Sequence, residues 1–267
     1  MIVILAALEE EVGDYLKIAE FRLADNVDSI RFYESNMFSY VAVVIGGPGR
    51  SCAQSTTTAA IDRYHPQLIV SAGFGGGTVP DLKPGHLVVA DTVLALTGPE
   101  AKWSRDSTTL AKKSSSRKRW LNLLTRSMNS PHVLGSIVTV DSLVTSAKKK
   151  AWLGKTLSDV MIVDLETYWV TQIAAERATE CVSLRSMLDP VGQNLPAFVT
   201  QATENACKRS WWHAAAYSLK CPSDVPTLLA LSSQYKSAKH SLSKALHSFS
   251  SSSGLKHHEM RSGQIDG

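Results

Sequence analysis

Short apolar runs recur between residues 1 and 188, and polar segments separate them. Seven runs read as strands, at 1–7, 40–47, 66–77, 85–96, 135–145, 160–166 and 181–188. Continuous apolar runs of this length are typical of strands that are buried on both faces. Three segments between them read as helices, at 9–21, 51–64 and 167–179, and Ser51 is the expected N-cap of the second. Strands alternating with helices predict an α/β fold with a mixed, mostly parallel central sheet flanked by helices.

The pattern changes after about residue 196. The stretch "SWWHAAAYSLKCPSDVPTLLALSSQYKSAKHSLSKALHSF" indicates two helices that a Cys-Pro pair separates, and the second carries a stripe of leucines. The final residues are polar and have no apolar periodicity, which is typical of disorder. We therefore expect one α/β domain at 1–200, extra C-terminal helices packed on it at 201–250, and a disordered tail at 251–267.

Composition narrows the class of protein. The chain has 267 residues, of which 44% are hydrophobic and 19% charged, with a net charge of +4, as in an ordinary globular protein. The basic runs at 111–120 and 148–150 read as solvated faces, because nucleic-acid sites carry more charge or interleaved aromatic residues. The four cysteines have no metal-ligand spacing. We expect no metal, no cofactor and no nucleic-acid partner.

The apolar runs also bear on location. None approaches the roughly 18 apolar residues of a membrane-spanning helix. The opening "MIVILAALEEEV" has no basic segment before its apolar run, unlike a signal peptide. These features predict a cytoplasmic protein without a membrane span.

Glycines cluster where the third apolar run ends. "VSAGFGGGT" at 70–78 has four glycines in five positions, and glycine lets a backbone approach a ligand closely. The stretch is no dinucleotide fingerprint, because Thr78 stands where a third glycine is needed, and no Gly-Lys-Ser/Thr follows for a P-loop. These absences argue against a dinucleotide-dependent oxidoreductase.

Carboxylates also follow the apolar runs, at the strand ends where α/β sheets bind ligands. Glu11, Glu166 and Asp189 all occupy such positions. One acid there often only favours a helix N-terminus. Three around one cleft suit cleavage of a glycosidic bond, which needs an acid for the leaving group and a base for water.

Four blocks resemble one family, the purine nucleoside phosphorylase / methylthioadenosine–adenosylhomocysteine nucleosidase superfamily. They are "MIVILAALEEEV", "PQLIVSAGFGGGTVPDLKPGHLVVAD", "IVDLET" and "LRSMLDP". Their order and spacing agree with the family over about 1–196. The resemblance implies the nucleoside phosphorylase-like fold, a purine nucleoside as substrate and a homo-oligomer.

The resemblance also implies roles for individual residues. Asp189 matches the acid at purine N7, Glu11 matches the residue that orients the attacking water, and Arg185 would pair with the acidic region. Glu166 matches the carboxylate that holds the ribose hydroxyls. The other implied substrate-binding residues are Phe74, Gly75, Leu143, Asp164 and Leu165, of which Leu143 matches a position that packs on the purine.

Two residues of the expected site differ from the pattern of the family. Phe74 stands where the nucleosidases have a small hydroxyl residue, and Leu188 stands where a serine precedes the acid. A protein that binds nucleosides without cleaving them is thus an alternative, against which the presence of all the charged site residues argues.

"SMLDPVGQNLP" and the C-terminal region resemble the hopanoid-biosynthesis branch, which implies adenosylhopane as substrate and adenine as product.

Water or phosphate could be the nucleophile. The acidic run at 9–11 would repel a phosphate, which favours hydrolysis. Arg50, at the glycine-rich turn "GGPGR", could instead bind phosphate. Phosphorolysis is therefore the runner-up.

Overall fold

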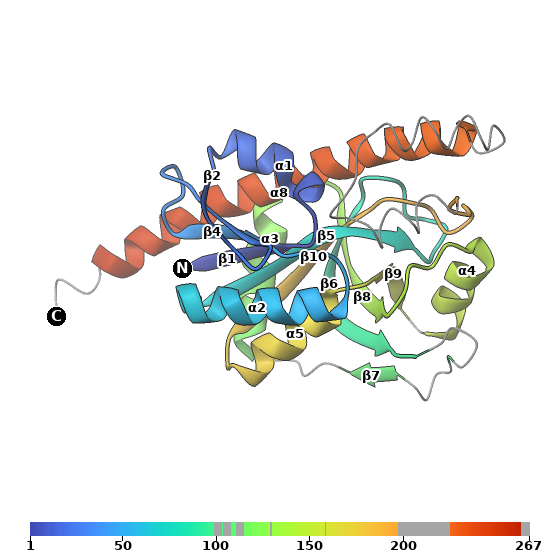
Figure 1. Ribbon diagram of the computed structural model, residues 1–267, viewed down its shortest axis with the longest axis horizontal. Helices are drawn as coiled ribbons and strands as arrows, with labels where there is room; N and C mark the ends of the chain where they lie inside the picture. The colour runs from blue at the N-terminus through green and yellow to red at the C-terminus, as the bar shows by residue number, and fades with distance from the viewer. Residues whose placement is uncertain are drawn as a thin grey trace.

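The computed structural model describes residues 1–98, 103, 108–110, 115–128, 130–157, 159–196 and 225–262. In these residues a ten-stranded mixed sheet runs through the middle of the molecule and helices cover both of its faces (Figure 1). The strands are β1 Ile2–Ala6, β2 Arg22–Val27, β3 Ile30–Glu34, β4 Val41–Ile45, β5 Leu68–Gly77, β6 Leu87–Leu96, β7 Thr108–Leu110, β8 His132–Val140, β9 Val160–Asp164 and β10 Glu180–Met187. The helices are α1 Glu9–Ile18, α2 Arg50–Tyr64, α3 Ser115–Ser127, α4 Ala147–Thr156, α5 Thr167–Glu176 and α8 Val225–Ser262.

The strand order is β10-β6-β8-β9-β5-β1-β4-β3-β2, and β10 also pairs with β5. Five strands, β5, β10, β6, β8 and β9, therefore close on themselves. Parallel ladders join β4, β1, β5 and β10, and also β6, β8 and β9. Antiparallel ladders join these two groups and build the β2–β3–β4 edge. The expected mixed sheet is confirmed, with more antiparallel pairing than the apolar runs suggested.

Strand β5 belongs to both groups. Its residues 68–75 pair with β10, whereas Gly76 and Gly77 pair with β9. A Cβ atom on Gly75 would lie 2.4 Å from Cγ2 of Ile162 on β9, so the missing side chain lets the two strands meet. The glycine-rich end of β5 thus closes the sheet as well as facing the site.

Several elements escaped the apolar pattern. The β2–β3 hairpin has a mostly exposed first strand, and its turn uses Asp28 and Ser29 with positive φ. Helix α3 begins within the basic run at 111–120, and α4 begins just before the run at 148–150. The lysines and arginines there interrupt the apolar periodicity by which a helix is predicted. Helix α2 begins at Arg50 with Gly49 as its N-cap, so the prediction of Ser51 as N-cap was wrong.

Helix α8 crosses the molecule from one end to the other, against α1 and α3 (Figure 1). It continues to Ser262, whereas the sequence predicted a disordered tail from residue 251. The prediction of disorder failed because polar residues of this segment are buried. Ser250 and Ser253 lie in the core, and the Ser250 Oγ lies 2.6 Å from the Tyr15 hydroxyl of α1. The first of the two expected C-terminal helices lies outside the described residues. Within them, no helix is both long and apolar enough to cross a membrane.

Candidate active site

Glu11 lies in the first turn of α1, where β1 ends. Its Oε2 accepts hydrogen bonds from the backbone N–H groups of Ala7 at 3.1 Å and Leu8 at 3.0 Å, and its Oε1 accepts one from Phe74 at 2.9 Å. The residue is only 7% exposed. Burial raises the pKa of the Glu11 carboxyl, and the three N–H donors and the Arg185 charge oppose that rise. The carboxyl is therefore fixed between β1 and β5.

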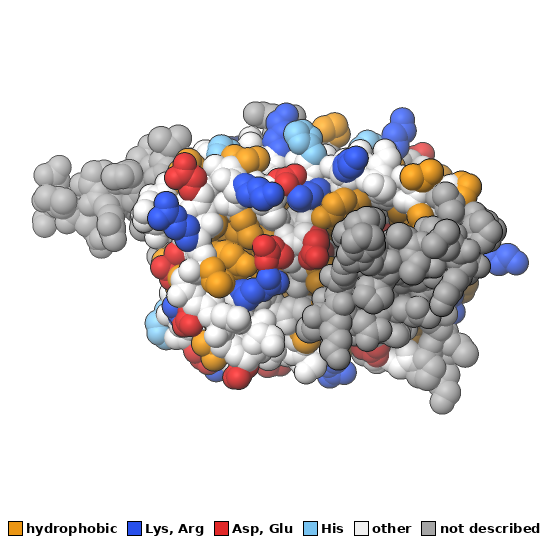
Figure 2. Space-filling model, turned by 45° about the horizontal axis from the view of Figure 1, so that its top comes forward, with side chains coloured by type: hydrophobic (Ala, Val, Ile, Leu, Met, Phe, Trp, Pro, Cys, Tyr) orange, Lys and Arg blue, Asp and Glu red, His pale blue; other side chains and the backbone are white. Residues whose placement is uncertain are grey.

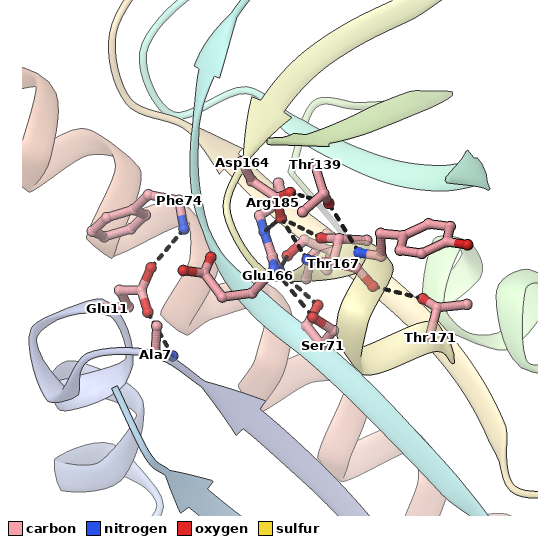
Figure 3. A network of polar contacts seen from close by, with 12 residues as sticks. Ala7, Glu11, Ser71, Phe74, Thr139, Asp164, Glu166, Thr167, Thr171 and Arg185 are labelled. Carbon is pink, nitrogen blue, oxygen red and sulfur yellow. Dashed lines mark hydrogen bonds and ion pairs between the residues drawn. The ribbon is translucent and has the colours of Figure 1, made fainter. Parts of the chain in front are cut away.

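The glycine before Phe74 makes this placement possible. A Cβ on Gly73 would lie 2.7 Å from the Glu11 Oε1. The Phe74 ring instead packs edge-on against Tyr235 of α8, with ring centroids 5.7 Å apart, and Figure 3 shows it directed away from the Glu166 carboxyl. Phe74 contributes its backbone N–H to the site, and its ring packs on α8.

Arg185 and Asp164 form an ion pair inside the protein. The Arg185 Nε donates to the Asp164 Oδ2 at 2.8 Å, and the two side chains are 2% and 1% exposed. The guanidinium also donates to the carbonyl oxygen of Ser71 at 3.0 Å and to its Oγ at 3.1 Å. Arg185 is thus held between Asp164 and Ser71 of β5 (Figure 3).

The oxygens of Asp164 have other donors too. Thr139 Oγ1 donates to the Asp164 Oδ1 at 2.6 Å, and both the N–H and the hydroxyl of Thr167 donate to Oδ2. With Arg185, these donors occupy the carboxylate. Asp164 therefore orients Arg185, and its expected contact with substrate has no support in this arrangement.

Glu166 precedes α5 and points toward the same space as Glu11 (Figure 3). Its Oε1 accepts the Gly49 N–H at 2.8 Å. Burial first, and then the nearby charges of Asp164 and Glu11, raise the pKa of Glu166 to about 8 against the opposing effects of Arg185 and the Gly49 N–H. Three acids and one arginine thus share one buried region.

A small cavity lies among these side chains. Its volume is about 20 Å³, and its polar lining consists of Glu11, Thr56, Ser71, Glu166 and Arg185. The buried Oγ1 of Thr56 has no hydrogen-bond partner among the described residues. A polar cavity of this size holds about one water molecule.

A wide groove of about 830 Å³ lies beside the cavity, and Ala7 and Gly47 line both. Its lining is mixed: the charged side chains are Glu9, Glu10, Lys17, Arg31 and Lys239, and the larger apolar or aromatic ones are Leu8, Leu16, Phe21, Tyr33 and Tyr235. On the face that carries α1 and α8, acidic, basic and apolar side chains are interspersed (Figure 2).

Asp189 belongs to a second polar group, formed by the loop after β10 and by α4. The Lys150 Nζ donates to the Asp189 Oδ2 at 2.5 Å and to the Pro190 carbonyl at 2.7 Å. The Lys150 side chain is 0% exposed. Burial raises the pKa of Asp189, and the Lys150 charge opposes that rise.

Strand β5 connects the two polar groups. Gly73 faces Glu11, and a Cβ on Gly76 would lie 3.3 Å from the Asp189 Oδ2. Three residues of extended strand span about 10 Å. The glycines thus leave backbone exposed between a group of acids and a separate acid–lysine pair.

Residues 1–211 match the Phosphorylase superfamily. The chain belongs to this superfamily. It is 24% identical over 224 residues to the 5'-methylthioadenosine/S-adenosylhomocysteine nucleosidase of Geobacillus thermodenitrificans, covering 78% of this chain and 91% of the relative. It is 23% identical over 215 residues to the nucleosidase of that name from Tolumonas auensis, covering 78% and 94%.

Solved structures share the fold of this superfamily member. The futalosine hydrolase of Helicobacter pylori superposes with a TM-score of 0.68 at 18% identity, over 93% of this chain and 96% of the other. The 5'-methylthioadenosine/S-adenosyl homocysteine nucleosidase of the same organism gives the same values. The predicted nucleoside phosphorylase-like α/β fold is confirmed.

The four remaining predicted site residues have different surroundings in the structure. Gly75 packs on β9, and half-buried Leu165 packs against an apolar cluster below the sheet. Leu143 is half-buried after β8. Arg50 is exposed, and its guanidinium lies over the Trp169 ring at 4.1 Å.

Sequence reasoning missed Lys150 and Thr56. Lys150 is the third lysine of a basic run, and only the fold shows that it turns inward while Lys148 stays exposed. Thr56 lies inside α2 among three consecutive threonines. Neither position carried a signal that distinguished it from its neighbours.

Proposed function

We propose that this protein hydrolyses the N-glycosidic bond of a 5′-modified adenosine and releases adenine. The observation that carries the proposal is the water-sized polar cavity between Glu11, Glu166 and Arg185. The relatives and similar structures named above, which are nucleosidases and a futalosine hydrolase, support this class of reaction.

In this proposal the water in the cavity attacks C1′ of the ribose. Glu11 accepts the proton of the water, and the raised pKa of its buried carboxyl makes it a stronger base. Glu166 accepts hydrogen bonds from the ribose hydroxyls. Its ionised form, which a pKa of about 8 makes the minor form near neutral pH, stabilises the cationic sugar of the transition state. Arg185 keeps the two glutamates in register, because Asp164 and Ser71 fix its guanidinium.

Asp189 acts on the base. As the C1′–N9 bond breaks, its electron pair moves into the purine, and a proton from Asp189 reaches N7. Adenine then leaves as a neutral molecule, which is a better leaving group than its anion. About 10 Å of extended strand separates Gly73, beside Glu11, from Gly76, beside Asp189, and this length is compatible with a nucleoside bound between the two acids.

Water is favoured over phosphate for four reasons. The cavity admits one water molecule, and the surrounding carboxylates oppose an anion. The Gly49 N–H at the start of α2, where an anion would bind, is already bonded to Glu166. Arg50 lies over Trp169 rather than in the cavity.

The 5′ substituent is proposed to extend into the groove beside the cavity. Its charged lining favours a polar substituent, whereas adenosylhopane, the substrate that the branch resemblance implies, carries a large apolar one. The hopanoid role, a cytoplasmic location and a homo-oligomer stay predictions.

The test measures adenine release by chromatography. Methylthioadenosine, adenosylhomocysteine, adenosine and a 5′-alkyl adenosine are each incubated with and without phosphate. We expect release that does not need phosphate and that falls by about 100-fold or more in Glu11→Gln. A control, Glu176→Gln, changes an exposed glutamate of α5 that lines neither the cavity nor the groove. Phosphate dependence would establish a phosphorylase, and binding without release would establish a binding protein.

A further inference from the structure

Lys150 is the buried partner of Asp189, and the proposed reaction assigns a role to Asp189 but none to Lys150. The Lys150 ammonium is 0% exposed, and two of its three N–H bonds donate to the Asp189 Oδ2 and the Pro190 carbonyl. A buried ammonium is costly unless it is paired. In the same basic run, Lys148 is exposed and half-buried Lys149 lies over the Trp103 and Trp152 rings.

We propose that Lys150 is the source of the proton that Asp189 delivers to the departing purine. The inference rests on the proposed function, since it assigns the origin of a proton in that reaction. Lys150 would act through Asp189 and is thus a positioning residue, without contact to the substrate.

The surroundings of the carboxylate support this path. From α4, Lys150 faces Asp189; from β5, Gly76 faces it with backbone alone. The Arg185 guanidinium is committed to Asp164 and Ser71. Among these groups, only Lys150 carries a proton within hydrogen-bond distance of Asp189.

The C1′–N9 bond breaks and its electrons enter the purine. The Lys150 Nζ passes a proton to the Asp189 carboxylate, and Asp189 passes that proton on to N7, so Asp189 ends the step as a carboxylate. Water forms the new bond to C1′ and loses a proton to Glu11. Lys150 is left as a neutral amine, and it recovers its proton from solvent as Glu11 releases one.

A structural ion pair makes a different prediction from a proton source. If Lys150 only holds Asp189 in place, the variant Lys150→Arg, which keeps the charge, restores adenine release. If it supplies the proton, its loss slows only those reactions whose leaving group needs one. Adenine needs a proton to leave readily, whereas 4-nitrophenolate is a stable anion and does not.

The experiment compares adenine release with 4-nitrophenolate release from a 4-nitrophenyl riboside that carries the same 5′ group. We expect Lys150→Met to lower kcat for adenine release by about 100-fold and to change kcat for the nitrophenyl riboside only a few-fold. Asp189→Asn should show the same selectivity, and the control Lys148→Met should match wild type with both substrates.

A second variant keeps the inference testable if Lys150→Met does not fold. Lys150→Arg preserves the charge and the hydrogen bonds, but guanidinium does not release its proton in proteins. We expect it to remain slow for adenine release. Full adenine release by Lys150→Arg, or equal losses with both substrates, would overturn the inference alone. Wild-type protein that releases no adenine would overturn the proposed function and this inference with it.

Discussion

The Glu166 carboxylate accepts the backbone N–H of Gly49 at 2.8 Å, and this bond joins the start of α5 to the start of α2. The positive end of a helix dipole favours an anion at this place. Burial and the two nearby acids act against it, because both raise the pKa of Glu166. The surroundings of Glu166 in the folded protein therefore destabilise the ionised form of its carboxyl group.

Replacing Glu166 should make stability less dependent on pH. Its pKa is about 8 in the folded protein against an ordinary value of 4.5. The native state therefore binds more protons than the unfolded state between these values, and stability falls as the pH rises through that window. Glu166→Gln cannot titrate, so its Tm relative to wild type should rise between about pH 5 and about pH 9.

Thermal unfolding at a series of pH values checks this prediction, with the exposed Glu176→Gln of α5 as the control. Parallel curves for Glu166→Gln and wild type would contradict it. The same variant should lose about 100-fold or more in activity, because an amide cannot stabilise a cationic sugar as a carboxylate does.

Breaking the Arg185–Asp164 pair should be costly. Asp164→Asn leaves a guanidinium buried without its counter-charge, and such losses amount to about 3–5 kcal/mol. The control, Asp62→Asn, breaks the exposed ion pair between Asp62 and Arg177, which is expected to contribute about 0–1 kcal/mol. Urea unfolding measures both. Similar costs for the two variants would show that the buried pair is not a structural anchor.

Adding one carbon at Gly73 should displace Glu11. The Cβ of Gly73→Ala would lie 2.7 Å from the Glu11 Oε1, so the carboxyl has to move away from the cavity. We expect kcat to fall by about 100-fold, as expected for a misplaced general base. In Gly13→Ala of α1 the new Cβ has no neighbour closer than 4.0 Å, and stability should rise by up to about 1 kcal/mol. Unchanged kcat in Gly73→Ala would exclude Glu11 as the base.

Truncating Phe249 should destabilise the whole domain. This residue of α8 is 0% exposed and packs in the same core cluster as β1 and β5. Phe249→Ala should cost about 3–5 kcal/mol. Leu229 of the same helix is 68% exposed, and Leu229→Ala should cost about 0.5 kcal/mol or less. If urea unfolds Phe249→Ala in a single transition with this larger loss of unfolding free energy, α8 is part of the core. A small loss would show that α8 contributes little to the stability of the domain.

The sequence predicts the central strands well because their burial on both faces leaves a continuous apolar run, as in β1 and β4. Glu11, Glu166 and Arg185 were identified for a related reason. Each stands at or just beyond such a run, and the fold brings the strand ends together. Local order in the chain therefore predicts which residues reach the site.

The partners of those residues are not predictable in the same way. Asp164 and Arg185 are twenty-one residues apart, and only their meeting shows that the acid serves the arginine. Lys150 and Asp189 are thirty-nine residues apart and on different elements. The tail at 251–262 looked disordered because buried serines resemble exposed ones in sequence.

Strand β1 and helix α8 share one core cluster from opposite ends of the chain, and this has a consequence for synthesis. Ile4 leaves the ribosome long before Leu246 and Phe249, which cover the same cluster. At about 5–20 residues per second, the delay is roughly 12–50 s. During that time the apolar side of the early strands has no cover from this helix. A nascent chain arrested before α8 should therefore be a better chaperone client than the finished protein.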